Sequence, residues 1–526
     1  MTDVVTAKDL TQEEKRLLFW ASFFALTAAG FGFAFRVAMG GVYGEELGLT
    51  NHQIGQIFGA SLWPIALTMI GFSLFVDRTG YKTPMIFAFL LQGASGVLTF
   101  TAESYGALYF AAFCAGLGHG IVEAVINPIC ATVYPKEKTK WLTILHASWP
   151  AGLALGTLAI IGTESMIEGW RAHALWILGP AVAYLLMYLK CRFPVDERVQ
   201  AGVPYIDMLR QVGFLGAFLA SFMMIYEIGN QVHELTAWTK PENWFNVSLL
   251  MGLAVGGIFG KAVNALGQPI FFLMCLLMIP LATTELGTDS WIKKLMTPVL
   301  ENNDFNPAYA LVFSASIMLV LRVFAGGILK FFTPPSLLCL SGVFSAVGLW
   351  WLSSATGTAI FIAFVLYAMG QTYYWPCVLG FTAERYPQGG ALTLNTVSAI
   401  GLLSVGIVGG QLLGVGFDKS IHATMSEEAP ALAQASSESK SFLGMTHEAI
   451  LPDRKDAYLA NLTVGEQQEL GALYTQAETQ AGRDILTYAA RFPMILAVAF
   501  GLIALSFRSK GGYKPIELDA GEEDPA

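Results

Sequence analysis

The chain has 526 residues, of which 54% are hydrophobic and only 13% are charged, and its mean hydropathy is +0.55. Soluble domains carry roughly a quarter charged residues, so this composition excludes a soluble globular protein. The apolar residues recur as many runs of about twenty, which excludes a protein with a single membrane anchor. The net charge of −9 comes without a basic face, so we expect the lipid bilayer as a partner and no nucleic acid.

Motifs for catalysis and for metal binding are not found in polar segments. The six cysteines lie in or beside apolar runs without metal-ligand spacing, so we expect free thiols and no metal site. Neither a nucleotide-binding loop nor a hydrolase motif stands in a soluble segment, so we expect no cofactor and no enzyme activity. The polar stretch 2–16 lacks a basic region with a cleavage site, so we expect no cleaved signal peptide.

The apolar runs predict an all-α polytopic membrane protein with about fourteen transmembrane helices. The first six are expected at 16–40, 52–76, 83–102, 106–133, 141–163 and 169–192. A pair follows at 207–229 and 243–263. The last six are expected at 268–287, 308–331, 334–353, 357–383, 391–415 and 485–508. Barrel strands are excluded because alternation of period two is absent.

The distribution of Lys and Arg predicts the orientation. Bases gather in alternate short loops, such as those with Arg78, Lys136 and Lys190, whereas the other loops are mostly acidic. We therefore expect a multi-pass protein of the plasma (inner) membrane with both termini, including the acidic tail, in the cytoplasm. The polar stretch 416–484 then faces outside, as a flexible loop or as a pair of surface helices.

Two landmarks repeat along the chain. Thr83-Pro84 returns as Thr333-Pro334, and the segment 131–135 returns as 383–387, at offsets of 250 and 252 residues. This duplication predicts two six-helix halves, at 1–193 and 267–526, around a linker and an inserted helix pair at 194–266. Parallel repeats with a solute site at their interface are typical of secondary transporters. Inserted helices usually lie outside such a site, so the pair is expected at its periphery.

A loop after the second helix resembles the signature of the major facilitator superfamily. The segment 73–82 reads Ser-Leu-Phe-Val-Asp-Arg-Thr-Gly-Tyr-Lys, in which Asp77, Arg78, Gly80 and Lys82 match the motif. The resemblance implies a cytoplasmic loop between the second and third helices. Its glycine allows a tight turn, and its acid can lock to neighbouring bases and release them when the halves rock.

A second resemblance is to the fucose and hexose permease branch of that superfamily. The fourth helix carries Gly118-His119-Gly120 followed by Glu123 and by Asn127-Pro128, at the spacing of this branch, and 284–291 is similar to the end of its seventh helix. The resemblance implies a role for Glu123, with Asn127 beside it, in sugar binding or proton coupling.

Charged residues inside the bilayer are costly and therefore mark candidate sites. Four stand out: Arg36, Glu123, Glu285 and Arg322. Glu123 shares a helical face with His119 and Asn127, which suits a proton-coupling group. Arg36 and Arg322, one in each half, could form a clamp for an anion. Structural ion pairs, of Arg36 with Glu123 and of Arg322 with Glu285, are the alternative.

The tenth helix aligns by the internal repeat with the fourth. Its Gln371, Tyr374 and Trp375, with Asn395 of the eleventh helix, could bind hydroxyl groups and stack on a polyol ring. His146 and Trp149 of the fifth helix are lesser candidates. Aromatic residues that only pack against lipid or neighbouring helices are the alternative for this set.

Together these features predict a monomeric secondary active transporter with alternating access, coupled to protons. Its first expected solute is a sugar or polyol. An organic anion, such as a carboxylate or a phosphate ester, is the alternative and would use Arg36 and Arg322. A transporter-like sensor or assembly protein without flux is a further alternative, in which the inserted helices and 416–484 hold a partner.

Overall fold

The computed structural model describes residues 5–518 except 168, 237, 289–307 and 443–444. Twelve helical segments within these ranges are long and apolar enough to cross a membrane. The predicted polytopic all-α protein is therefore confirmed. The acidic tail from Asp519 onward, and the part of 284–291 beyond Thr288, lie outside the described residues.

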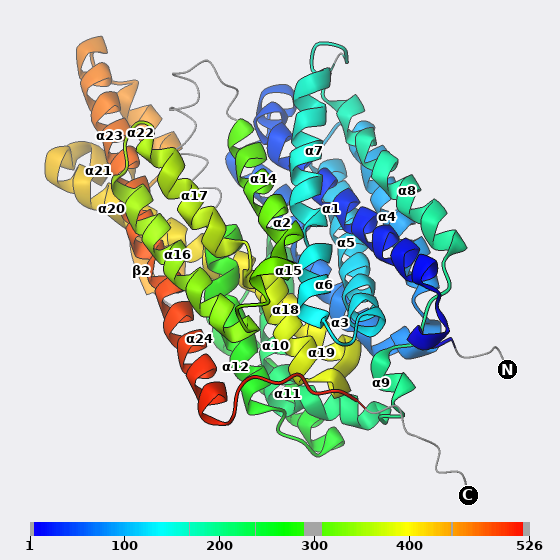
Figure 1. Cartoon of the computed structure of the whole chain (residues 1–526). Helices are drawn as coiled ribbons and strands as arrows, with labels where there is room; N and C mark the ends of the chain where they lie inside the picture. Colours follow the sequence, from blue (N-terminus) through cyan, green and yellow to red (C-terminus); the bar gives the residue numbers. More distant parts are fainter. Residues whose placement is uncertain (1–4, 168, 237, 289–307, 443–444, 519–526) are drawn as a thin grey trace, which may run out of the picture.

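Two groups of helices form the bundle and lie side by side in Figure 1. The first half comprises α1 Gln12–Leu47, α2 Asn51–Ala60, α3 Trp63–Thr79, α4 Lys82–Phe100, α5 Tyr105–Val133, α6 Lys138–Leu145, α7 Ser148–Thr163, the 3-10 helix η2 Arg171–Ile177 and α8 Leu178–Lys190. The second half comprises α12 Pro269–Ala282, the π-helix η3 Thr283–Gly287, α14 Tyr309–Val323, α15 Ala325–Ile328, α16 Pro334–Ser354, α17 Ala359–Gln371, α18 Tyr374–Arg385, α19 Gly390–Ser404, the π-helix η5 Val405–Gly409, α20 Gly410–Glu428 and α24 Arg491–Ser509. Short turns at η1 Ala7–Asp9, α9 Glu197–Gln200 and η4 Pro387–Gly389 complete the loops.

Small residues allow the helices of the first half to approach closely. A Cβ at Gly152 of α7 would lie 2.3 Å from the Thr27 carbonyl oxygen of α1, and a Cβ at Gly120 of α5 would lie 2.4 Å from the Ile65 carbonyl oxygen of α3. Because no side chain fits there, these two glycines set the backbone separation. The first half therefore packs as one tight body around α5.

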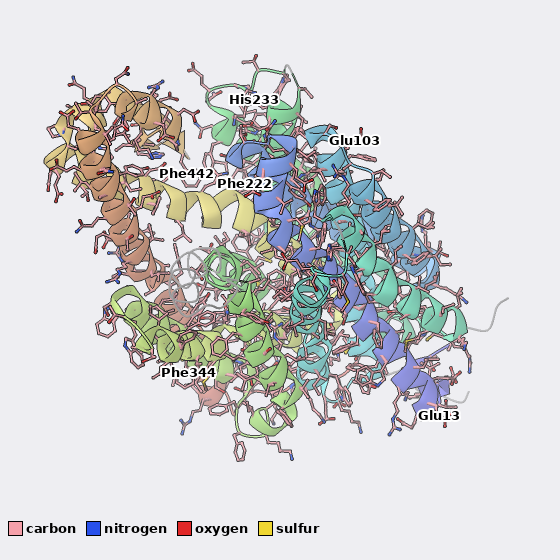
Figure 2. The ribbon with its side chains drawn as sticks, turned by 90° about the horizontal axis from the view of Figure 1, so that it is seen from above. Glu13, Glu103, Phe222, His233, Phe344 and Phe442 are labelled. Atoms are coloured by element: carbon pink, nitrogen blue, oxygen red, sulfur yellow. The ribbon has the colours of Figure 1, made fainter. Side chains whose placement is uncertain are left out.

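The inserted pair, α10 Tyr205–Leu235 and α11 Trp244–Val263, packs with small residues of one helix against large residues of the other. Three glycines of α11 lie against three phenylalanines of α10 at matching spacing: Gly252, Gly256 and Gly260 face Phe222, Phe218 and Phe214. Helix α10 also hydrogen-bonds to both halves, because Gln231 accepts from Tyr109 of α5 at 2.8 Å and Gln211 donates to Gln388 of the second half at 3.1 Å. In Figure 2, Phe222 and His233 mark α10 on the side of the bundle opposite Phe344 of α16.

The stretch predicted as a loop or as surface helices is a folded lobe. It contains the end of α20, α21 Pro430–Ser436, the antiparallel strands β1 Ser437–Phe442 and β2 Met445–Ile450, α22 Pro452–Leu459 and α23 Val464–Ala489. A small core of its own holds it together, with Ile421 and Met425 of α20 packed with Leu432 and Tyr474. Of the two predicted alternatives, surface helices agree with the structure and a flexible loop does not, because apolar residues at helical spacing in α20 and α23 bury one another. Figure 2 shows Phe442 of this lobe beyond the side of the bundle.

Candidate functional site

A central cavity of about 430 Å³ lies between the two halves. Most of its wall is apolar and includes Phe33, Phe58, Trp149, Leu286, Phe364 and Trp375. Its polar groups are His119, Glu123 and His146 from the first half and Glu285, Ser314 and Arg322 from the second. The site is therefore an apolar chamber with charged groups from both halves.

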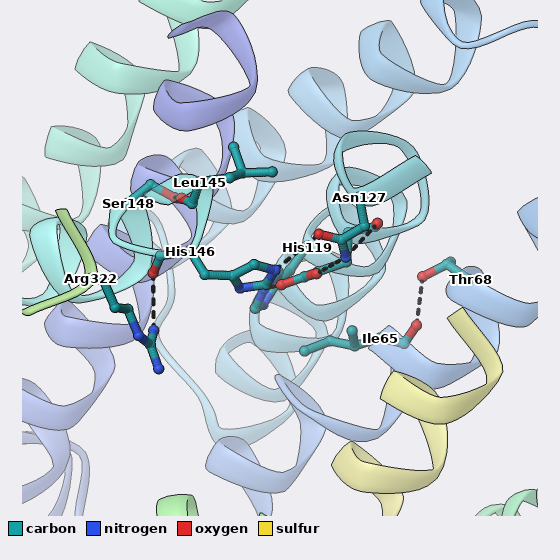
Figure 3. Close-up of polar contacts among 9 residues, drawn as sticks. Ile65, Thr68, His119, Asn127, Leu145, His146, Ser148 and Arg322 are labelled. Carbon is teal, nitrogen blue, oxygen red and sulfur yellow. Dashed lines mark hydrogen bonds and ion pairs between the residues drawn. The ribbon is translucent and has the colours of Figure 1, made fainter. Parts of the chain in front are cut away.

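The polar group of the first half is built on α5. His119 Nε2 lies 3.7 Å from Glu123 Oε1, and its ring stacks on Trp149 with 5.0 Å between centroids. Asn127 Nδ2 donates to Glu123 Oε2 at 2.7 Å, and Asn127 Oδ1 lies 2.9 Å from His146 Nε2. Figure 3 shows His119, Asn127 and His146 directed toward one another. Spacing of four residues on one helix aligns His119, Glu123 and Asn127, as the sequence predicts.

Arg322 links the two halves beneath the cavity. Its side chain is only 1% exposed, and its guanidinium donates to Glu285 Oε1 at 2.9 Å and to the carbonyl oxygens of His146 and Thr372 at 3.0 and 2.8 Å. Figure 3 shows the contact with the His146 backbone. The planar fork of an arginine can serve three acceptors at once, which an ammonium group cannot do as well. Glu285 Oε2 is buried and has no hydrogen-bond partner among the described residues.

Both carbonyl groups that Arg322 binds lack the usual helical hydrogen-bond donor because a proline follows each of them by four residues. A helical carbonyl normally accepts from the amide four residues later, but those positions are Pro150 and Pro376, which have no N–H. The same holds for Ala124, whose carbonyl precedes Pro128 by four residues and accepts from Asn395 Nδ2 at 3.1 Å.

A fourth carbonyl of this kind lies nearer the chain termini. Ala383 precedes Pro387 by four residues, and its carbonyl oxygen accepts from Lys138 Nζ at 3.2 Å. In three of the four cases the donor and the carbonyl come from opposite halves. Proline positions in the sequence thus account for three of the side-chain hydrogen bonds that join the halves.

Further contacts close the interface between the two halves, here called the seam. They lie at the end of the bundle that carries the chain termini, here called the terminal end. Glu384 of α18 accepts from the Thr139 backbone amide at 3.1 Å and from the Thr139 hydroxyl at 2.6 Å, and its second oxygen accepts from Tyr513 at 2.7 Å. Asn395 Nδ2 also donates to Ser73 Oγ at 2.7 Å. The cavity is therefore closed toward the terminal end.

The signature loop lies at the same end. Asp77 forms an ion pair with Arg198, Gly80 has a φ of +66° at the end of α3, and Lys82 donates to the Leu189 carbonyl oxygen at 3.3 Å. Arg78 is exposed. The predicted lock between Asp77 and a base is therefore present, with Arg198 as the base.

Asp196, two residues before that base, is the N-cap of α9, where it accepts from the Arg198 backbone amide at 2.9 Å, and it lies close to Gly390 at the start of α19. It accepts from Tyr81 Oη at 3.1 Å, and a Cβ at Gly390 would lie 2.8 Å from Asp196 Oδ1. Burial raises the pKa of this carboxyl above the usual value for aspartate, and the nearby Arg198 opposes that rise. An acid at a helix N-terminus is favoured by the helix dipole, so Asp196 stabilises the start of α9 while its side chain packs against Gly390 of the second half.

The structure separates the two arginines of the predicted clamp. Arg322 lines the cavity, but Arg36 lies between α1, α4 and η2 in a small void of the first half, and it contacts neither Arg322 nor Glu123. The clamp prediction is therefore wrong for this structure. The reason is helical phase, since Phe33 and Val37 hold the face of α1 toward the cavity and Arg36 is turned aside.

Of the residues predicted to bind a polyol, one lines the cavity and the others do not. Trp375 lines the cavity. Gln371 and Tyr374 are buried in the second half, where Gln371 lies near Met318 and Tyr374 Oη contacts the Ser341 carbonyl oxygen, and Asn395 is used between the halves. The predicted ion pair of Arg322 with Glu285 is present.

Sequence reasoning missed several groups at the seam. Lys138 and Glu384 lie in loops or at helix ends, where charges look unremarkable, although the repeated 131–135 and 383–387 segments mark their place. It also missed Glu227 of α10, which is 7% exposed and accepts from Gln231 at 2.8 Å. This acid stands within an apolar run and would have been found by counting every intramembrane charge.

A family model, the Major Facilitator Superfamily, matches residues 18–415. The chain belongs to this superfamily. It therefore has the fold of a superfamily of multi-pass membrane transporters of small-molecule solutes. The two repeat halves and the cavity between them are the parts of the superfamily fold that the duplication predicts.

Two relatives are similar over part of their length. A gentisate transporter of Corynebacterium glutamicum is 24% identical over 241 residues, covering 42% of this chain and 54% of the relative. A probable sulfoacetate transporter of Cupriavidus necator is 37% identical over 152 residues, covering 27% of this chain and 34% of the relative. The chain thus spans about half of the first relative and about a third of the second.

Solved structures of the superfamily show the same fold. The proton:xylose symporter XylE gives a TM-score of 0.61 at 12% identity, with 97% of this chain and 99% of XylE covered. The human organic anion transporter MFSD10 gives 0.56 at 11% identity, with 92% and 99% covered. A sugar symporter and an organic anion transporter thus share this superfamily fold, so the fold does not choose between the two solute classes.

Proposed function

We propose that this protein is a proton-coupled secondary transporter of a small organic acid with an apolar body and one acidic group. In this proposal the protein is a monomer in the plasma (inner) membrane with both termini in the cytoplasm, and the cavity faces outward. The apolar wall of the central cavity is the observation that carries the proposal.

The apolar wall supports an organic acid over a polyol as the preferred solute. A site for a sugar must offer a hydrogen-bonding partner to each buried hydroxyl, because every unpaired polar group costs free energy. Here the amides of Gln371 and Asn395 do not line the cavity, and Asn127 is bonded to Glu123 and His146. Trp149, Trp375 and Phe364 instead offer flat apolar surfaces to a planar or aliphatic body.

The acidic group would be bound near Arg322, the cavity arginine. Its guanidinium already binds one carboxylate, Glu285, in the geometry that a solute carboxylate or sulfonate could adopt. The relatives that are named for aromatic and sulfonated acids agree with this solute class. Glu123 and His119, 3.7 Å apart and facing the cavity, would accept and release the coupled proton.

The test is uptake into proteoliposomes, with and without a pH gradient. An aromatic acid and a short sulfonate should accumulate in response to the gradient, and a hexose should not. Trp149→Leu should reduce uptake of the aromatic acid at least tenfold, whereas the control Trp350→Leu, at a tryptophan that is 64% exposed, should not. Glu123→Gln should abolish accumulation driven by the gradient, while Glu164→Gln, at an exposed acid, should leave it intact.

Two outcomes would overturn the proposal. Accumulation of hexoses but not of organic acids would instead identify the protein as a sugar transporter. Absence of flux for every solute, with a protein that co-purifies with the chain, would favour the sensor or assembly alternative.

A further inference from the structure

A second, much smaller void lies inside the first half. It has a volume of about 10 Å³ and is bounded by residues of α1, α4 and η2. Its polar lining is formed by Arg36, Ser95, Thr99 and His173, and none of these residues lines the central cavity. It is therefore separate from the central cavity.

The groups around this void lack the partners that buried polar groups require. His173 is only 4% exposed, yet neither ring nitrogen has a hydrogen-bond partner in the described part of the chain. Arg36 Nε is buried and is likewise unpartnered within the described ranges. Unpaired buried groups of this kind cost about 1–3 kcal/mol each and are rare in native proteins.

The charge of Arg36 is also uncompensated. Across the residues that the structure describes, no carboxylate lies within ion-pair distance of Arg36, and the acid nearby on α1, Glu46, is paired with Arg171 at 3.5 Å. The Arg36 side chain is partly buried, but its Nε is fully buried without a partner among the described residues, and a cation in such a place is usually paired with an opposite charge. A small anion here would compensate the charge and would accept from these unpartnered donors.

The size of the void restricts the anion. About 10 Å³ admits one particle of roughly the size of a water molecule. A carboxylate, sulfate or phosphate does not fit, whereas a single-atom halide needs little adjustment. We propose that Arg36 and His173, with the hydroxyls of Ser95 and Thr99, bind one chloride ion within the first half.

Two glycines enclose the site. A Cβ at Gly32 would lie 2.8 Å from Ile177 Cδ1, and a Cβ at Gly96 would lie 2.8 Å from Ile177 Cγ2. Ile177 can therefore wedge between α1 and α4 only because both residues lack side chains. The ion joins three elements of the first half and should stabilise it as one rigid body.

The full chain, purified in detergent, provides the test. Its melting temperature is measured in sodium chloride or bromide and in sodium gluconate or sulfate at equal ionic strength. We expect a saturable rise with either halide and none with gluconate or sulfate. Arg36→Gln should lose this rise, while the control Arg171→Gln, at a partly exposed arginine of the same end, should keep it. Diffraction from crystals grown in bromide should show an anomalous peak between Arg36 and His173.

Several results would overturn the inference. Equal melting temperatures in all four salts, a water molecule without anomalous signal at this position, or a full halide response in Arg36→Gln would each do so. If Arg36→Gln does not fold, the bromide map of the natural chain decides alone. Loss of solute binding in Arg36→Gln, without any halide response in the natural chain, would instead assign Arg36 to the transported solute.

Discussion

Asn395 offers the sharpest test of how the two halves are held together. Its Nδ2 donates to Ser73 Oγ and to the Ala124 carbonyl oxygen, both in the first half. The Ala124 carbonyl depends on this donor because Pro128 removes the amide that it would otherwise use. Asn395→Leu keeps a similar volume but leaves that carbonyl unpaired whenever the terminal end is closed.

The expected magnitude follows from the number of groups affected. A buried carbonyl without a partner costs about 1–3 kcal/mol, and the lost bond to Ser73 adds about 0.5–1.5 kcal/mol. Burial of the leucine side chain offsets part of this loss. We expect a net change of about 1.5 kcal/mol against the closed terminal end, which is about a tenfold shift in the equilibrium between closed and open forms.

A native cysteine can report this shift. Cys377 of α18 is 0% exposed, and α18 packs on α6 of the other half, so opening of the terminal end uncovers its thiol. In a variant that keeps only this cysteine, the rate of labelling by a water-soluble maleimide should rise about tenfold with Asn395→Leu. Labelling after denaturation provides the total.

The decisive control is the double variant with Pro128→Ala. Alanine supplies the missing amide to the Ala124 carbonyl, so Asn395→Leu should then raise labelling much less than it does alone. An equal rise in both backgrounds would refute the role assigned to the proline. No rise in either background would refute the role assigned to Asn395.

Three further predictions concern buried polar contacts between parts of the bundle. Arg322→Lys keeps the charge but carries its three donors on one shorter-reaching atom, which cannot contact all three acceptors that the planar fork serves. The free energy of unfolding should therefore fall by about 1–3 kcal/mol in SDS titration, because at least one buried acceptor loses its partner; an unchanged value would contradict the buried network. Burial raises the pKa of Asp196, so the folded chain binds this proton more tightly than the unfolded chain, and stability should fall as the pH rises from about 4 through the raised pKa; Asp196→Asn should flatten this part of a profile of melting temperature against pH, and an identical slope would argue against it. Gln231→Leu should cost about 1–2 kcal/mol because Tyr109 and Glu227 lose their partner, whereas Gln468→Leu at an exposed position should be neutral; equal effects would show that α10 is not tied to the first half.

The fold could be predicted from the sequence because the bilayer restricts the choices. Long apolar runs must be helices there, and the repeats of 131–135 and of Thr83-Pro84 reveal the two halves. The cluster of His119, Glu123 and Asn127 was also predictable, since spacing along one helix fixes which side chains meet. The pairing of Arg322 with Glu285 remained one of two alternatives until the structure brought them together.

Other features depend on geometry that spacing does not contain. The rotation of α1 about its axis decides that Phe33 faces the cavity and that Arg36 does not, and neighbouring helices set this rotation. The two strands of the lobe escaped prediction because they are short and polar, with Phe442 and a few described residues of β2 buried. The sequence placed a sugar before an organic acid, and the proposed function reverses this order. The apolar wall of the cavity could not be predicted because residues from many separate helices form it.

The lobe is attached to the bundle in an unusual way. Helix α20 continues from η5 without a loop, and α23 leads directly into α24, so that one helical run extends over Val464–Ser509. At 1.5 Å per residue, the 26 residues of α23 form a rod about 39 Å long. Such a rod acts as a lever arm, which turns a small rotation of the second half into a larger displacement at its tip. A pair of fluorophores, one on the lobe and one on the first half, would therefore magnify the rocking motion that a probe inside the bundle could scarcely resolve.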